Sequence, residues 1–259
     1  MNTSLLIAER PDDRTAILTL NRPERRNALT IELMESLCET LAALSQEPRR
    51  RVVVLRGSGP AFCAGLDLYE AAETDLAQRS AEWVARTFQA VAESPLATIA
   101  AVHGAAYAGG AGLMACCDLV VAADDLRVCF PEVRRGLVAA LAAAALSGRV
   151  RDGDLRELLL LAEPVDAQRA LAMGLVERVV PGPQLLAESQ SMAATLLRGG
   201  PDAIRDTKHL LRDLGTTDRE RFFATALQVH KQARSGDEAR EGLAAFAERR
   251  PPAWSAGIE

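Results

Sequence analysis

The feature that most constrains the fold of this chain is the stretch "VHGAAYAGGAGLMACCDLV", residues 102–120. Short apolar runs flank a cluster of small residues, which predicts a strand, a tight turn and the start of a helix. Glycine lets another atom approach the backbone closely, and the free N–H groups of a helix's first turn favour negative charge. The spacing of Gly104, Gly109, Gly110 and Gly112 does not match G-x-G-x-x-G, which argues against a nucleotide-phosphate loop.

A second turn of small residues, "GPAFCAGLDL" at 59–68, also follows a predicted buried strand. Two such turns can each supply one backbone N–H to the same oxygen. That arrangement is an oxyanion hole, which stabilises a carbonyl that becomes negative during a reaction. The spacing alone leaves open whether the turns meet, and tight packing of helix against strand is the structural alternative for each glycine.

The remaining pattern predicts an α/β protein with helices dominating its second half. We expect a core domain over residues 1–195 and a helical region over 196–259. Aromatic residues make up only 4% of the chain, so the core is expected to consist of Ala, Leu and Val. The predicted strands are 4–8, 15–20, 51–57, 96–102 and 118–123, with a shorter strand near 127–130, and helices are expected at 31–46, 82–93, 166–174, 182–200, 201–211, 217–234 and 237–250. From residue 136 onward we expect almost only helices.

Charge and composition exclude several classes of protein. The formal net charge of −5 argues against a nucleic-acid surface. No apolar run approaches the ~20 residues of a membrane span, and no signal peptide is visible, so we expect a cytoplasmic protein. Five cysteines without a C-x-x-C pair indicate reduced, buried thiols and no metal site. Of these, Cys63 is expected to be the most exposed.

Several motifs, in order along the chain, resemble the enoyl-CoA hydratase/isomerase (crotonase) superfamily. "AFCAGLDL" at 61–68 and residues 101–137 are similar to its two signature regions. "LTLNRPERRNAL" at 18–29, "ALAMGLVERVVP" at 170–181 and "GLAAFAERRPPAW" at 242–254 are similar to further family segments. The resemblance implies an α/β fold, a crotonase-like spiral of ββα units with a C-terminal helical trimerisation region. It also implies a homotrimer or a dimer of trimers.

The resemblance further implies that the substrate is an acyl-CoA thioester, with coenzyme A as part of the substrate and no separate cofactor. Its carbonyl would lie between the backbone N–H groups of Leu66 and Gly109. Arg26 would lie near the anionic nucleotide end of coenzyme A, which suits a guanidinium. The implied substrate-binding residues are Arg26, Ala28, Ala64, Leu66, Asp67, Leu68, Tyr69, Tyr107, Gly109, Gly110 and Gly112.

The acidic residues of this chain differ from those of the two-glutamate hydratases in the family. Two-glutamate hydratases carry one acid three residues after the oxyanion glycine, and this chain has Gly112 there. The second acid is kept as Glu132, which beside Leu137 and Val138 is expected to have a raised pKa and to act as acid and base. The structural alternative is that Glu132 caps a helix start after Pro131. His103 is expected to be structural.

Three functions stay open on these residues. The function expected first is a hydratase that adds water to a 2-enoyl-CoA, as in bacterial hydratases of branched acyl-CoAs, some of which also have Gly at the first acid position. The second is a Δ3-Δ2-enoyl-CoA isomerase, for which the single carboxylate Glu132 suffices. The third is an inactive acyl-CoA-binding homologue. A hydratase needs a polar partner that holds water opposite Glu132, whereas an isomerase does not.

Overall fold

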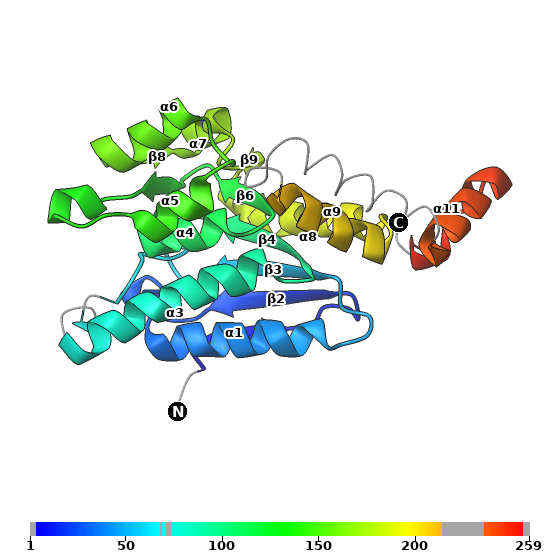
Figure 1. The fold of residues 1–259 in the computed structure, drawn as a ribbon, viewed down its shortest axis with the longest axis horizontal. Helices are drawn as coiled ribbons and strands as arrows, with labels where there is room; N and C mark the ends of the chain where they lie inside the picture. Colours follow the sequence, from blue (N-terminus) through cyan, green and yellow to red (C-terminus); the bar gives the residue numbers. More distant parts are fainter. Residues whose placement is uncertain (1–3, 68, 71–73, 214–235, 256–259) are drawn as a thin grey trace.

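The computed structural model describes residues 4–67, 69–70, 74–213 and 236–255. One sheet of six strands crosses the molecule in the order β1-β2-β3-β4-β6-β9, and a smaller sheet has the order β5-β7-β8 (Figure 1). All neighbours in the large sheet are parallel except β1 and β2. The strands are β1 Leu6–Glu9, β2 Thr15–Leu20, β3 Val52–Gly57, β4 Ala97–Val102, β5 Ala105–Tyr107, β6 Leu119–Ala123, β7 Arg127–Cys129, β8 Val165–Asp166 and β9 Arg178–Val180.

Helices cover both faces of the large sheet, which is why its strands are almost continuously apolar. Alternate residues of β4 face opposite sides: Ala100 and Val102 join the core beneath α1, α3 and α4, while Ile99 and Ala101 pack beneath α8. The helices are α1 Ile31–Ser45, α3 Thr74–Ala92, α4 Gly109–Ala115, α5 Ala140–Leu146, α6 Asp152–Arg156, α7 Ala167–Met173, α8 Leu185–Leu197, α9 Pro201–Asp213 and α11 Asp237–Glu248.

Caps predicted from the sequence fix two of these helices. Thr30 precedes α1, and its hydroxyl accepts a hydrogen bond from Leu33 N at 3.2 Å. Asp166 precedes α7, and its Oδ1 accepts from Arg169 N at 2.8 Å. Side chains of this type satisfy the otherwise unpaired N–H groups of a first turn. Both helix starts are therefore confirmed where the sequence placed them.

The expectation of almost only helices after residue 136 is confirmed for the described residues, with two short exceptions. The two-residue strand β8 pairs with β7, and the three-residue strand β9 extends the large sheet beside β6. Strands of two or three residues are too short to show an alternation of apolar and polar residues. They form because a neighbouring strand offers backbone groups to pair with. The helix expected at 82–93 begins earlier, at Thr74, and the helix expected at 217–234 lies outside the described residues.

The C-terminal helices extend from one end of the sheet, with α9 beside α8 and α11 furthest out (Figure 1). The Lys208 ammonium on α9 pairs with Asp118 at 2.8 Å and donates to Leu96 O at 3.0 Å, which ties α9 to the core. The proposed boundary at 195/196 falls inside α8, so the division into two domains stays a prediction. None of the described helices is long and apolar enough to cross a membrane.

Candidate active site

The two turns of small residues lie side by side. An isolated parallel bridge joins Cys63 to Ala106, with Cys63 N donating to Ala105 O at 3.1 Å and Tyr107 N donating to Cys63 O at 3.0 Å. A Cβ placed on Gly65 would lie 2.9 Å from Tyr107 O and 3.3 Å from Gly109 N. The structure thus answers the question that the spacing left open, because the backbone of one turn packs directly on the other.

The amide of Leu66 points away from its neighbouring segment. Leu66 forms a parallel bridge with Leu29, in which Leu29 N donates to Gly65 O at 2.8 Å and Asp67 N donates to Leu29 O at 2.9 Å. The residue between two such bonds directs its own N–H to the opposite side. Within the described part of the chain, no acceptor is found for Leu66 N.

The amide of Gly109 is the first of helix α4. The preceding Ala108 has φ 48° and ψ −122°, a conformation that costs a non-glycine residue energy. The first bond of the helix runs from Gly112 N to Ala108 O at 2.9 Å, so Gly109 N–H has no partner within α4. None of the residues that the structure describes accepts from it either.

Gly109 and Gly110 are small for different reasons. A Cβ on Gly110 would lie 2.2 Å from Cys63 O, so the contact between the turns excludes any side chain there. A Cβ on Gly109 would meet nothing closer than 3.6 Å, which is ordinary van der Waals contact, and would lie 3.8 Å from Leu66 N. The protein itself therefore tolerates a methyl group at 109, but that group would lie beside the space shared by the two free amides.

Phe88 occupies the space beside Gly112. A Cβ on Gly112 would lie 2.4 Å from Cζ of Phe88, which projects from α3 and is only 6% exposed. The phenyl ring thus fills the volume that a side chain at 112 would enter. Sequence reasoning missed this residue, because a phenylalanine on the apolar face of a helix has the same signal as any core residue.

Glu132 follows the end of β7, next to the strand that leads to Gly109. Tyr107 of β5 is paired with Cys129 of β7, and the chain then turns through a 3₁₀ segment, Glu132–Arg135. Oε2 of Glu132 is buried, and no described residue hydrogen-bonds to it. This oxygen is therefore available to accept a proton inside the protein.

Burial raises the pKa of Glu132, and its own amide and the Arg135 guanidinium partly offset that rise. The raised pKa agrees with the sequence-based expectation, but the apolar neighbours named for it were wrong. Leu137 is 60% exposed and Val138 is 84% exposed, so neither encloses the carboxyl group. The chain between Gly136 and Ala139 runs over the surface, although its apolar residues would suggest a buried segment.

The loop after Leu66 is fastened to the segment after β2. The carboxylate of Asp67 is buried and accepts two hydrogen bonds from the Arg22 guanidinium, both at 3.1 Å. Further along, Oε2 of Glu70 accepts from Ile31 N at 2.9 Å at the start of α1. Asp67 was predicted to bind substrate, but its carboxylate is occupied within the protein.

Asn27 organises the segment opposite that loop, and sequence reasoning gave it no role. It is fully buried with φ 56°, and its Nδ2 donates to Ser58 O and Ala61 O, both at 2.8 Å. Its Oδ1 accepts from Arg22 N at 2.8 Å. A buried asparagine in a loop is expected to hydrogen-bond to backbone groups. The asparagine in the loop segment "RRNAL" was therefore a recognisable candidate for this role.

The other predicted binding residues lie around these turns. Arg26 is exposed, and its carbonyl accepts from Ala64 N at 2.9 Å. Tyr69 is 71% exposed, and the Arg25 guanidinium lies 5.0 Å from the centre of its ring. Ala28 is partly buried, and so is Tyr107, which is the last residue of β5. Leu68 lies outside the described residues.

The expectation that Cys63 is the most exposed thiol is wrong. Cys63 is fully buried, its Sγ lies 3.1 Å from Asn27 O, and burial raises its pKa to about 12. Such a thiol is a packing residue rather than a nucleophile. Among the residues that the structure places, no group of three or more His, Cys, Asp or Glu side chains is arranged to hold a metal ion.

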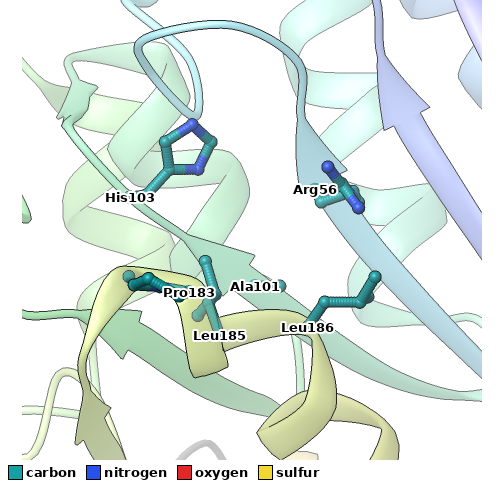
Figure 2. A pocket seen from close by; sticks show the side chains of 7 residues that line it. Arg56, Ala101, His103, Pro183, Leu185 and Leu186 are labelled. Atoms are coloured by element: carbon teal, nitrogen blue, oxygen red, sulfur yellow. The ribbon is translucent and has the colours of Figure 1, made fainter.

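A cavity of about 340 Å³ lies on the other side of the sheet, beneath the start of α8 (Figure 2). Its wall includes His103, whose Nε2 is 2.9 Å from Gly59 O, which agrees with the structural role expected for this histidine. Ala101 belongs to the α8 face, whereas α4 covers the opposite face. The cavity is therefore separate from the two free amides.

Comparisons with known proteins cover nearly the whole chain. Residues 12–257 match the family described as "Enoyl-CoA hydratase/isomerase". A Thermus thermophilus protein named "Putative enoyl-CoA hydratase" is 39% identical, over 92% of this chain and 96% of that protein. The enoyl-CoA hydratase structure from Mycobacterium smegmatis is 34% identical with a TM-score of 0.92, over 97% and 99% of the two chains. The enoyl-CoA hydratase structure from Bacillus anthracis is 28% identical with a TM-score of 0.91, over 96% of this chain and 98% of that one. These similarities confirm the predicted crotonase-like α/β fold.

Proposed function

The chain belongs to the enoyl-CoA hydratase/isomerase family, and we propose that it stabilises the enolate of an acyl-CoA thioester and moves one proton with Glu132. The observation that carries the proposal is the pair of unpartnered amides, Leu66 N and Gly109 N, around one small space. Coenzyme A enters as part of the substrate, and the proposed chemistry calls for no further cofactor.

The free amides supply the stabilisation that an enolate needs. Each preorganised donor aimed at a developing oxyanion contributes about 3 kcal/mol to the transition state in enzymes of known mechanism. Backbone donors need no side chain, so small residues around them leave room for the thioester oxygen. Leu66 and Gly109 are the proposed oxyanion residues, Gly110 lets the backbone of Cys63 approach, and Gly112 leaves room for the ring of Phe88.

Of the reactions open to such a site, the geometry favours Δ3-Δ2-enoyl-CoA isomerisation. The ionised Glu132 takes a proton from C2 of a 3-enoyl-CoA, which leaves a dienolate held by the two amides. The same carboxyl group returns the proton to C4, and the double bond moves from C3 to C2. One carboxylate suffices, and Phe88 leaves the Gly112 position apolar where two-glutamate hydratases have their other acid.

Hydration of a 2-enoyl-CoA is the second candidate, favoured by the names that similar proteins carry. In this reaction water adds its oxygen to C3 while C2 receives a proton, and Glu132 would both accept from the water and donate to C2. Asp67 and Asn27 are not free to hold that water, because their side-chain polar atoms are bonded within the protein. The apolar surface of Phe88 therefore disfavours hydration relative to isomerisation.

The two reactions are separated by assaying crotonyl-CoA hydration and 3-enoyl-CoA isomerisation with the wild-type protein and with Glu132→Gln. We expect isomerisation to exceed hydration in the wild type and both to be lost in the variant. Faster hydration would select the second candidate. Turnover of neither substrate, with binding of crotonyl-CoA retained, would select the inactive acyl-CoA-binding homologue.

The assembly and location of the protein follow the same family logic. We propose that the C-terminal helices support a homotrimer or a dimer of trimers, and that the protein is cytoplasmic. The extension of α9 and α11 from one end of the sheet supports the first point (Figure 1). Sedimentation velocity measures the assembly directly, and a monomer at micromolar concentration would contradict it.

A further inference from the structure

We propose that the buried ion pair between Arg22 and Asp67 is a positioning device for the Leu66 amide. The inference rests on the proposed function, in which that amide binds the thioester oxygen. Neither side chain is available to touch substrate, because both are bonded within the protein. They act through the backbone that they hold, and they are positioning residues rather than catalytic ones.

The Arg22 guanidinium links the two segments that form the Leu29–Leu66 bridge. Its Nη1 donates to Ala28 O at 2.6 Å, one residue before Leu29. Both Nη1 and Nη2 donate to Asp67 Oδ2 at 3.1 Å, one residue after Leu66. The same two segments are also joined by the two backbone bonds at Leu29 and by Ala64 N, which donates to Arg26 O.

Each end of the pair is itself fixed. Asn27 Oδ1 accepts from Arg22 N at 2.8 Å, and Asn27 N donates to Arg22 O at 2.9 Å, so the backbone of Arg22 is locked. On the other side, Asp67 Oδ1 accepts from Tyr69 N at 3.0 Å, which closes a turn just after Leu66. The carboxylate of Asp67 is therefore bonded both to the Arg22 guanidinium and to the amide of Tyr69.

The burial of the pair argues for positioning rather than for stability alone. The side chain of Arg22 is 15% exposed and that of Asp67 is 8% exposed. A buried ion pair is weak evidence for stability, because desolvation offsets much of the attraction between the charges. Its two-sided geometry is specific, however, and small misplacement of a group that stabilises a transition state costs up to ~10²-fold in rate.

The test is the Asp67→Asn variant. If its Oδ1 keeps the Tyr69 amide, its Nδ2 faces the Arg22 guanidinium, and the link to Arg22 is lost. For isomerisation of a 3-enoyl-CoA we expect kcat to fall about tenfold or more while KM changes less than about threefold. A fall in stability alone would lower the folded fraction, so rates are referred to folded protein measured by urea unfolding.

A matched control is Glu47→Gln. Glu47 pairs with the buried Arg50 at 2.8 Å and also with Arg10 at 2.8 Å, at the end of α1 away from both turns. We expect a loss of stability without a change in kcat of the folded protein. If Asp67→Asn does not fold, Arg22→Lys replaces it, since lysine keeps the charge but not the fork of donors. The same division between kcat and KM is expected.

The carbonyl stretch of bound crotonyl-CoA, labelled with ¹³C at C1, separates this inference from the proposed function. In a Glu132→Gln background, infrared difference spectra should show the stretch at lower frequency than in water, because two amides polarise the carbonyl. Adding Asp67→Asn should reduce that displacement. No displacement in Glu132→Gln itself would overturn both proposals. An equal displacement with and without Asp67→Asn, or an unchanged kcat, would overturn the ion-pair inference alone.

Discussion

Replacing Gly109 by alanine isolates the oxyanion site from the packing around it. The new methyl group would meet Leu29 Cδ1 at 3.6 Å and Leu66 N at 3.8 Å, which are ordinary contacts. Alanine is also favoured over glycine inside a helix by up to about 1 kcal/mol. The free energy of unfolding should therefore stay unchanged or rise slightly.

The activity of Gly109→Ala should fall even though the fold is intact. The methyl group lies beside the space between the two amides, so the thioester oxygen must move from its best position. Losing about half of one donor's ~3 kcal/mol corresponds to a fall of about tenfold in kcat/KM. The assay is isomerisation of a 3-enoyl-CoA, with stability measured by urea unfolding.

Gly110→Ala is the matched comparison, one residue along the same helix. Its Cβ would lie 2.2 Å from Cys63 O, a backbone atom that cannot move without shifting the neighbouring turn. We expect a loss of about 1–3 kcal/mol in stability, the usual range for overpacking. The reasoning is refuted if Gly109→Ala keeps full activity, or if it is destabilised as much as Gly110→Ala.

Three further predictions concern the acid, the apolar wall and the cap of α7. The kcat/KM for isomerisation should rise with pH through a pKa above the ordinary carboxyl value, because burial raises the pKa of Glu132 and only its ionised form accepts the proton; a pH–rate profile with its acid limb at the ordinary value would contradict this. Gly112→Ala should lower the melting temperature, because its Cβ would lie 2.4 Å from Phe88 Cζ. Adding Phe88→Leu should raise the melting temperature again, and no such recovery in thermal unfolding would show that the ring is not the obstacle. Asp166→Ala should cost about 1 kcal/mol in urea unfolding by removing the cap of α7, and an unchanged free energy of unfolding would contradict that role.

Local signals were sufficient for much of the fold. Thr30 and Asp166 mark helix starts by a mechanism that needs only their immediate neighbours. The strands β2, β3 and β4 are read from apolar runs that are buried on both faces. The short strand β9, by contrast, exists because β6 offers an open edge, and no residue within it carries that information.

In the candidate site, too, residues with a local signal were predicted, and residues defined by distant partners were not. The two turns and Glu132 were found because small residues and a carboxylate at those positions are unusual and resemble a family pattern. Phe88 and the Arg22–Asp67 pair were missed, because each is defined by a partner that is distant in the sequence: residue 112 on another helix, and residues 45 apart across two loops. The apolar neighbours assigned to Glu132 are a different case: Leu137 N donates to Glu132 O at 3.0 Å, but the side chains of Leu137 and Val138 are exposed, which their apolar character did not indicate.

The most direct test of the account is the exchange of the C2 hydrogens of butyryl-CoA in D₂O, followed by proton NMR. This saturated thioester offers no double bond to hydrate or to move, so exchange reports only formation of an enolate and return of a proton. We expect exchange with the wild-type protein, slower exchange with Gly109→Ala, and none above background with Glu132→Gln. Exchange that persists undiminished in Glu132→Gln would contradict the assignment of Glu132 as the group that moves the proton.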